Sequence, residues 1–191
     1  GDLYERLRDV TQTETELPQM QVGPLEGRFL RNMARLVGAR RAVEVGTFTG
    51  YSALSIAEGM LPGGKLITCD VDPVATAIAQ RYFDEAPWGD RIELRLGPAA
   101  DTLAGVDGPL DLAFIDADKT GYVAYWDLLV PRMRPGGVIL VDNVLWSGAV
   151  LAPEQDSAHA LVAFNRHVAA DDRVDQVMLT IRDGITMAVV R

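Results

Sequence analysis

The feature that most constrains this chain is the alternation of short β-rich runs with amphipathic helical patterns. The predicted strands are residues 41–46, 65–70, 91–97, 110–116 and 137–142, and the predicted helices are residues 24–38, 51–61, 73–85 and 121–133. Such alternation is typical of a parallel sheet with helices on both faces. Residues 110–116 and 138–142 are nearly continuous apolar runs, as expected of strands buried on both faces. The sequence therefore predicts an α/β fold.

The final stretch has a different pattern. Residues 174–181 and 185–191 are two strand-like runs separated by Arg182-Asp183-Gly184. Asp-Gly between two strand patterns is a strong hairpin signal. We therefore expect a Rossmann-like, mostly parallel seven-stranded sheet that ends in an antiparallel hairpin. Residues 1–22 precede the first clear core helix and are expected to form a lid or a dimer contact.

Composition and charge limit the classes of partner. The 191 residues correspond to about one α/β domain. The sequence contains 18 Lys and Arg and 27 Asp and Glu, which gives a formal charge of −9. It has no run rich in Lys or Arg. Nucleic acid and anionic membranes are therefore unlikely partners.

Neither cysteine chemistry nor a membrane span is expected. Cys69 is the single cysteine, so no intramolecular disulfide or cysteine-rich metal site can form, and a small buried core residue is expected there. No apolar run approaches the roughly 20 residues that a membrane-spanning helix needs. The first residues do not resemble a signal peptide, so the cytoplasm is the expected location.

A glycine turn follows the first predicted strand and opens a helix, in the sequence Glu44-Val45-Gly46-Thr47-Phe48-Thr49-Gly50. Its spacing is not the Gly-x-Gly-x-x-Gly of pyrophosphate-binding turns, so a ligand without phosphates is favoured. Asp70 ends the second predicted strand, where a carboxylate can accept hydrogen bonds from both ribose hydroxyls. Glu44, Gly46 and Asp70 together indicate a nucleoside ligand. The alternatives are a turn that serves packing only and an Asp70 that caps a helix, although Asp72 is the nearer cap candidate.

Acidic and amide side chains end two further predicted strands. Asp116 closes residues 110–116, and Asp142 with Asn143 closes residues 137–142. In an open α/β sheet, ligands bind at the carboxyl ends of the strands. Two carboxylates and an amide oxygen are ligands that suit Mg²⁺ or Mn²⁺. The sequence thus predicts a metal site, the alternative being that these residues cap the following helices or loops.

Four ordered motifs resemble a known family. They are residues 44–52 (Glu-Val-Gly-Thr-Phe-Thr-Gly-Tyr-Ser), 115–119 (Ile-Asp-Ala-Asp-Lys), 142–146 (Asp-Asn-Val-Leu-Trp) and 183–186 (Asp-Gly-Ile-Thr). From about Met20 to its end, the chain resembles the cation-dependent O-methyltransferases that include the caffeoyl-CoA and catechol enzymes. The resemblance implies S-adenosyl-L-methionine (AdoMet) as methyl donor, a bound Mg²⁺ (or Mn²⁺ or Ca²⁺), a seven-stranded sheet and a homodimer.

The resemblance also implies individual roles. It assigns the metal to Asp116, Asp142 and Asn143, and catalysis to Lys119, as the base, with Asp116. The implied AdoMet contacts are Val22 (through its backbone), Glu44, Gly46, Thr47, Ser52, Asp70, Ala99 and Asp118. Trp146 and Ser147 are the implied substrate contacts.

The sequence departs from the plant pattern at several points. Val22 replaces a Thr, and Gly121 and Ser147 each replace an Asn. Residues 151–160 contain no Lys or Arg, whereas the phosphates of a coenzyme A thioester usually need cationic partners. A small catechol-like phenol is therefore the expected acceptor.

The expected reaction is a metal-dependent methyl transfer from AdoMet to a hydroxyl of that phenol. Three alternatives remain open at this point. They are methylation of hydroxyuridine in transfer RNA, a nicotinamide oxidoreductase, and a non-catalytic AdoMet-binding protein.

Overall fold

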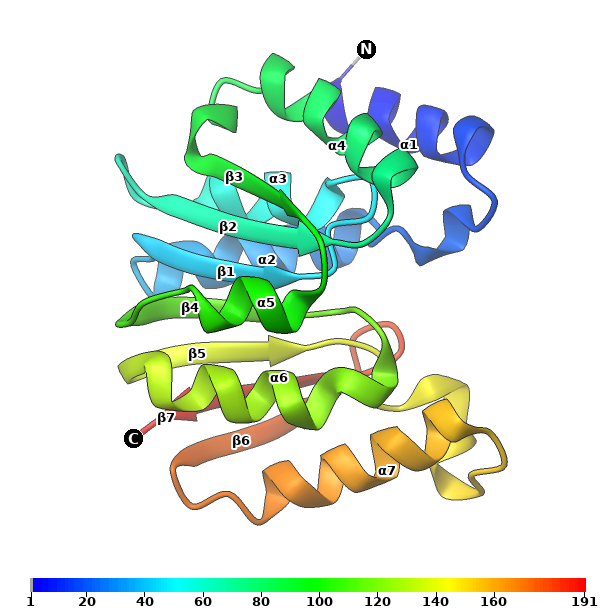
Figure 1. The fold of residues 1–191 in the computed structure, drawn as a ribbon, viewed down its shortest axis with the longest axis vertical. Coiled ribbons are helices and arrows are strands. Elements are labelled where there is room, and N and C mark those ends of the chain that lie inside the picture. Colours follow the sequence, from blue (N-terminus) through cyan, green and yellow to red (C-terminus); the bar gives the residue numbers. More distant parts are fainter. Residues whose placement is uncertain (1) are drawn as a thin grey trace.

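Seven strands form one sheet in the order β3-β2-β1-β4-β5-β7-β6 in the computed structural model, which describes residues 2–191 (Figure 1). The strands are β1 (Arg41–Val45), β2 (Lys65–Asp70), β3 (Ile92–Leu96), β4 (Leu110–Ile115), β5 (Met133–Val141), β6 (Val174–Leu179) and β7 (Ile185–Val190). β1 to β5 are mutually parallel, and β7 runs antiparallel to both β5 and β6. The predicted sheet and its C-terminal antiparallel hairpin are confirmed.

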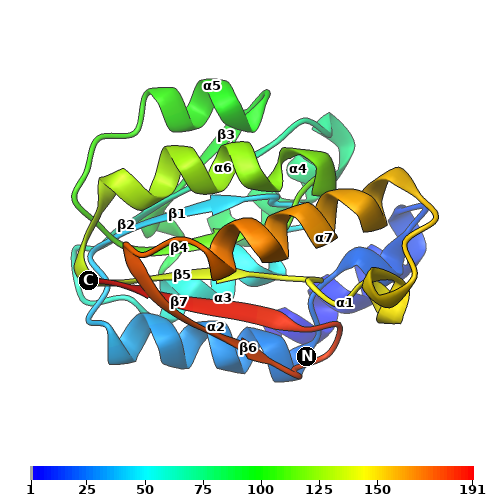
Figure 2. The same ribbon diagram turned by 90° about the horizontal axis from the view of Figure 1, so that it is seen from below.

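Helices cover both faces of this sheet. They are α1 (Leu3–Glu14), α2 (Pro24–Leu36), α3 (Tyr51–Gly59), α4 (Pro73–Glu85), α5 (Ala99–Ala104), α6 (Tyr122–Leu129) and α7 (Asp156–Ala169). Buried side chains of α1 to α4 pack into one apolar core, and those of α5 to α7 pack into a second core across the sheet. Figure 2 shows α2 and α3 on one side of the strands and α5, α6 and α7 on the other. In the described part of the chain, no helix has both the length and the apolar character to cross a membrane.

The boundaries differ from the prediction mainly around Pro131. The helix predicted for residues 121–133 ends as α6 at Leu129, and a 3-10 turn over Val130–Arg132 follows, with Pro131 in its first positions. A proline cannot continue the helical hydrogen-bond ladder. β5 then begins at Met133 rather than at residue 137, because Met133 already pairs with Leu110 ahead of an irregular register. The mostly polar helix α1, the short helix α5 and helix α7 lie outside the predicted helical segments.

The parallel strands bring the candidate site residues to one edge. β1, β2 and β5 point toward the same side of the sheet in Figure 1, and the loop that follows each strand emerges there. Cys69, near the end of β2, is buried as predicted. The glycine turn, Asp70, Asp116 and Asp142 therefore all lie on the carboxyl edge of the sheet.

Candidate active site

The glycine turn after β1 lies directly against the loop that follows β4. Gly46 adopts φ +100°, and its N–H donates to the Cys69 carbonyl at 2.9 Å. A Cβ atom at Gly46 would stand only 2.1 Å from the carbonyl oxygen of Asp116. Glycine is needed here for both the backbone conformation and the close approach. The predicted nucleoside turn and the predicted metal residue are thus neighbours.

Glu44 is a fully buried acid at the base of this turn. Its Oε2 accepts a 2.5 Å hydrogen bond from the Thr68 hydroxyl, while its Oε1 has no partner within residues 2–191. Burial raises the pKa of the Glu44 carboxyl to about 8, against the opposing effect of the nearby Thr68 and Ser52 hydroxyls. Thr47 extends this hydrogen-bonded group of side chains, because its hydroxyl lies 2.6 Å from the Thr68 hydroxyl. A buried acceptor without a partner suits a hydrogen-bond donor on a ligand.

Asp70 accepts hydrogen bonds from the turn rather than capping a helix. Its two oxygens accept from the Phe48 amide at 2.7 Å and from the Asp72 amide at 3.1 Å. The cap of α4 is instead Asp72, which accepts from the Val74 and Ala75 amides, as predicted. Each Asp70 oxygen retains a further lone pair for a ribose hydroxyl.

The other cofactor candidates are spread around the same edge. Val22 is buried just before α2, and Ala99 is the first residue of α5. Asp118 accepts from the Tyr125 hydroxyl at 2.5 Å and from the Thr120 hydroxyl at 3.2 Å. Gly121 makes room for this arrangement, because a Cβ there would meet the Tyr125 ring at 2.5 Å.

Asp142 and Asn143 leave β5 beside the end of β4. Asp142 is buried, and its Oδ2 accepts from the Asn143 side-chain amide at 3.1 Å. Its Oδ1 has no partner among the described residues. Burial raises the pKa of the Asp142 carboxyl, and the negative charges of Asp116 and Glu26 raise it further. A buried carboxylate with a free oxygen and acidic neighbours fits a hard divalent cation.

Glu26 is an acid of this region that we did not predict. It lies in the first turn of α2, is fully buried, and accepts from the Arg182 guanidinium at 2.7 Å. Burial raises the pKa of Glu26 against the opposing charge of Arg182. One signal was present in the sequence, since Glu26 shares the buried stripe of α2 with Leu30 and Ala34. Charged residues are rarely fully buried without a specific reason.

The carboxylates do not by themselves form a complete ligand set. Within residues 2–191, no three or more His, Cys, Asp or Glu side chains are grouped so as to hold a metal ion. The candidate ligands Asp116, Asp142 and Asn143 comprise two acids and one amide. A cation there would need oxygen atoms from water or a substrate, which is usual for Mg²⁺.

Lys119 is fixed beside Asp116 and is nearly buried. Its Nζ donates to Asp116 Oδ1 at 3.0 Å and to the Tyr122 hydroxyl at 2.5 Å. Tyr122 in turn donates to the Asp142 carbonyl at 3.0 Å, so its oxygen is an acceptor for Lys119. Asp116 is therefore the ion-pair partner of Lys119. Tyr122 is thus a second group that sequence reasoning missed.

Trp146 and Ser147 border an open cavity of about 300 Å³ next to this site. Both residues adopt positive φ, near +50°, in the turn after β5. The Trp146 ring centroid lies 5.5 Å from Lys119 Nζ, and the Ser147 amide donates to Asp183 at 2.6 Å. The remaining lining residues are Ala149, Ala152, Glu154, Gln155 and Ala158. The lining therefore contains two acids and no Lys or Arg.

Comparison with known proteins places the chain in one family. The family model described as O-methyltransferase matches residues 2–191. The chain belongs to the O-methyltransferase family. This confirms the resemblance seen in the four motifs. It also removes the nicotinamide oxidoreductase from consideration.

Three relatives illustrate the range of this family. Catechol O-methyltransferase domain-containing protein 1 of Mus musculus is 37% identical over 170 residues, which are 85% of this chain and 65% of the mouse protein. Probable caffeoyl-CoA O-methyltransferase 1 of Dictyostelium discoideum is 34% identical over 194 residues, covering 97% of this chain and 84% of its own length. The crystal structure of the Bacillus cereus O-methyltransferase in complex with SAH has a TM-score of 0.92 and 33% identity, and covers 100% of this chain and 92% of that one.

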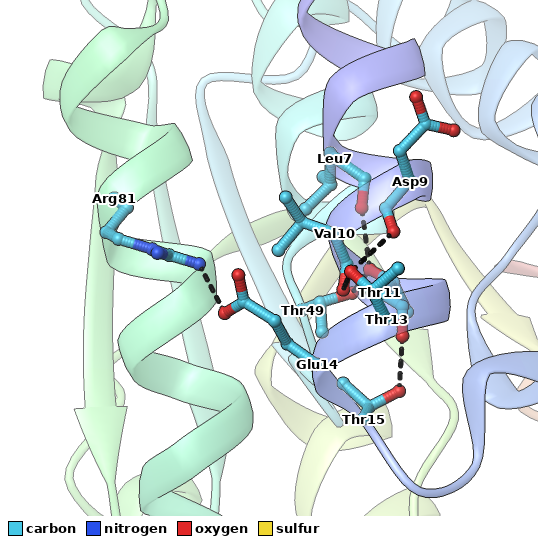
Figure 3. Close-up of polar contacts among 9 residues, drawn as sticks. All are labelled: Leu7, Asp9, Val10, Thr11, Thr13, Glu14, Thr15, Thr49 and Arg81. Carbon is cyan, nitrogen blue, oxygen red and sulfur yellow. Dashed lines mark hydrogen bonds and ion pairs between the residues drawn. The ribbon is translucent and has the colours of Figure 1, made fainter.

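The N-terminal helix of this O-methyltransferase is attached to the glycine turn (Figure 3). The Thr11 hydroxyl on α1 donates to Thr49 at 2.9 Å, and Gln21 Nε2 reaches both hydroxyls, at 2.6 and 2.9 Å. Arg81 of α4 pairs with Glu14 at 2.9 Å on the outer side of α1. The segment predicted as a lid or dimer contact therefore touches the candidate cofactor turn.

Proposed function

We propose that this O-methyltransferase transfers a methyl group from AdoMet to a hydroxyl of a catechol-like small molecule, with a divalent cation bound at Asp116, Asp142 and Asn143. The observation that carries the proposal is the contact between the Gly46 turn and the Asp116 backbone. Through this contact, the glycine turn lies next to an acidic group in which a buried oxygen of Asp142 has no partner among residues 2–191. A methyl donor and a metal-held acceptor need such neighbouring sites.

The proposed AdoMet site uses the residues around the glycine turn. The partnerless oxygen of Glu44 and the remaining lone pairs of Asp70 are acceptors for the donor groups of AdoMet. Thr47, Ser52 and Ala99 complete this side of the site, together with Asp118 and the Val22 backbone. The Bacillus cereus structure with SAH supports the assignment, because SAH is the demethylated product of AdoMet.

The proposed chemistry is an in-line displacement at the methyl carbon of AdoMet. A phenol with a pKa of about 10 is a weak nucleophile at neutral pH. When bound, the cation favours the phenolate and fixes it for attack. The phenolate oxygen forms a bond to the methyl carbon while the carbon–sulfur bond breaks and SAH leaves. We assign the neutral amine of Lys119 as the group that accepts the phenolic proton, while Asp116 and Tyr122 accept hydrogen bonds from its N–H groups.

The acceptor cavity favours a small phenol over a coenzyme A thioester. Its lining carries Glu154 and Asp183 but no cationic side chain that would pair with phosphates. Trp146 offers an aromatic wall beside Lys119. Transfer RNA is the alternative acceptor, and the formal charge of −9 disfavours it. A methyl-transfer screen across catechols, caffeoyl esters, flavonoids and transfer RNA, each with and without Mg²⁺, separates these classes.

The substitution Asp142→Ala tests the proposed function. We expect Mg²⁺-dependent methyl transfer to a catechol to fall by roughly a hundredfold or more, because the variant loses a metal ligand. AdoMet affinity, measured by calorimetry, should stay within about threefold, which separates the loss of a metal ligand from the loss of the fold. A wild-type protein that binds AdoMet without turnover would instead be a non-catalytic AdoMet-binding protein. Asp175→Ala, which removes an exposed acid on β6, is the matched control. Unchanged turnover in Asp142→Ala, or in wild-type protein with excess EDTA, would contradict the metal mechanism.

We further propose a homodimer formed through α2. Leu25 and Leu36 lie eleven positions apart, about three helical turns, and are 67% and 80% exposed. Two exposed leucines on one helix face suit an apolar contact with a second copy. Light scattering should give twice the chain mass of 20.8 kDa, and Leu36→Glu should give the monomer, whereas Leu96→Glu on β3 should not. A monomeric wild-type protein would refute the homodimer. Location in the cytoplasm stays a prediction.

A further inference from the structure

We propose that Glu26 is an outer carboxylate of the cation site, which binds a water molecule on the cation, and that Arg182 holds Glu26 in place for this role. The inference rests on the proposed function, because it presumes a cation at Asp116, Asp142 and Asn143. It adds two residues, from α2 and from the β6–β7 turn, that none of the four sequence motifs pointed to as site residues.

The first observation concerns unsatisfied oxygens. Glu26 and Asp142 are both buried, and each has one carboxylate oxygen without a partner in residues 2–191, Oε1 and Oδ1 respectively. The two carboxyl groups lie within hydrogen-bonding reach of each other, and each affects the pKa of the other. A buried carboxylate oxygen normally has a hydrogen-bond donor. A hydrated cation beside these oxygens would supply donors and positive charge together.

The second observation concerns how Glu26 is held. Arg182 occupies only one of its oxygens, at 2.7 Å, and so leaves Oε1 free. Arg182 has φ +47°, a conformation uncommon for a residue other than glycine. The turn that carries Arg182 is also hydrogen-bonded to the loop that follows Asp142. The Val144 and Leu145 amides of that loop donate to the carbonyls of Gly184 and Asp183 at 3.1 and 3.0 Å. Arg182 therefore connects α2 to the loop that follows Asp142.

The charges indicate an effect on cation affinity. When all of these side chains are ionised, the three carboxylates of Glu26, Asp116 and Asp142 exceed the two cations of Lys119 and Arg182 by one negative charge. Loss of the Glu26 charge would make this group neutral and leave Arg182 uncompensated. Glu26 is not assigned as a direct ligand, because the described residues contain no set of three such side chains that could hold an ion. Substitution of a residue that hydrogen-bonds to the ligands of a metal typically lowers metal affinity by about 10- to 100-fold.

The test measures Mn²⁺ and Mg²⁺ binding to the whole chain by calorimetry, without acceptor. In Glu26→Gln, the amide oxygen can still accept from Arg182, so the fold should be retained while the charge is lost. We expect Mn²⁺ affinity to fall by about 10- to 100-fold, with AdoMet affinity within about threefold of wild type. Glu58→Gln is the matched control, since Glu58 is also an arginine-paired acid, bonded to Arg31 of α2 at 2.8 Å. Its Mn²⁺ affinity should stay within about twofold.

A second variant and a second measurement keep the test decisive. Glu26→Asp keeps the charge but shortens the side chain, and we expect at least about a threefold weaker Mn²⁺ affinity. The rise in melting temperature on adding Mn²⁺ should also shrink in both variants, whereas a merely structural role would lower the melting temperature equally with and without the ion. Wild-type Mn²⁺ affinity in whichever Glu26 variant folds would overturn the inference.

The outcome is separable from that of the proposed function. If the wild-type protein binds no cation, or if Asp142→Ala binds it unchanged, the proposed metal site itself is wrong. If Asp142→Ala loses the cation while Glu26→Gln keeps it, only the role of Glu26 is wrong.

Discussion

At the scale of single residues, the candidate site depends on side chains that the sequence pattern places at strand ends. Asp116, Asp142 and Asn143 could be predicted, because parallel strands end at one edge. Glu26 and Arg182 could not be paired in the same way, since 156 positions separate them and only the folded sheet brings them together. The end of a strand can be recognised from neighbouring residues in the sequence. The packing of a helix against a turn that is distant in the sequence cannot.

Gly46 gives a prediction at this scale. Gly46→Ala should destabilise the fold by roughly 3 kcal/mol or more, because the new Cβ would stand 2.1 Å from a backbone oxygen that cannot rotate away. The control is Gly63→Ala, where φ is +75° and nothing lies within 4 Å of the Cβ position. That variant should lose only about 1–2 kcal/mol, the cost of the backbone conformation. Thermal unfolding measures both, and equal losses would mean that the contact with Asp116 is unimportant.

At the scale of elements, strands and long helices were predictable because each has a clear period. α1 was not, because most of its residues are polar and Leu7 is the one apolar side chain of this helix that is fully buried. Its attachment depends on buried hydroxyls of Thr11 and Thr49 and on Gln21, far from each other in the sequence. α5 is only six residues long and has too few turns to show a helical period.

Thr11 gives a prediction at the scale of this helix. Thr11→Val should cost about 1–3 kcal/mol, because Gln21 and Thr49 would keep buried polar groups with fewer partners. Thr13→Val is the control, since Thr13 is exposed on the same helix and bonds only to the α1 backbone. It should change the free energy of unfolding by less than about 0.5 kcal/mol. Faster proteolysis within α1 in Thr11→Val alone would support the attachment, and identical behaviour of the two variants would refute it.

At the scale of the whole molecule, the charge of −9 acts on every anionic ligand. Its field reaches further at low ionic strength, because the screening length is about 10 Å at 0.1 M salt and about 30 Å at 0.01 M. The sequence alone provides this property, since charge does not depend on which residues meet in the fold. A phosphate-bearing acceptor should therefore be repelled before it reaches the cavity.

The salt dependence of turnover tests this repulsion. With AdoMet saturating, kcat/KM for a coenzyme A thioester of a catechol acid should rise severalfold between about 0.01 and 0.2 M NaCl, as repulsion is screened. The value for a neutral catechol should stay nearly constant and is the control. A fall with salt for the thioester would reveal a cationic docking surface and would contradict the preference for small phenols.

The position of β7 has a consequence for biosynthesis. This strand is translated after both of its neighbours, β5 and β6, yet it lies between them in the sheet. The strands β1 to β4 are contiguous in the sheet and emerge first, so a nascent chain on the ribosome can pair them early. The other half, in which Asp142 follows β5, must wait until residues 185–190 have emerged and inserted beside β5. We therefore expect a stalled polypeptide that lacks them to be inactive even when its first half has folded.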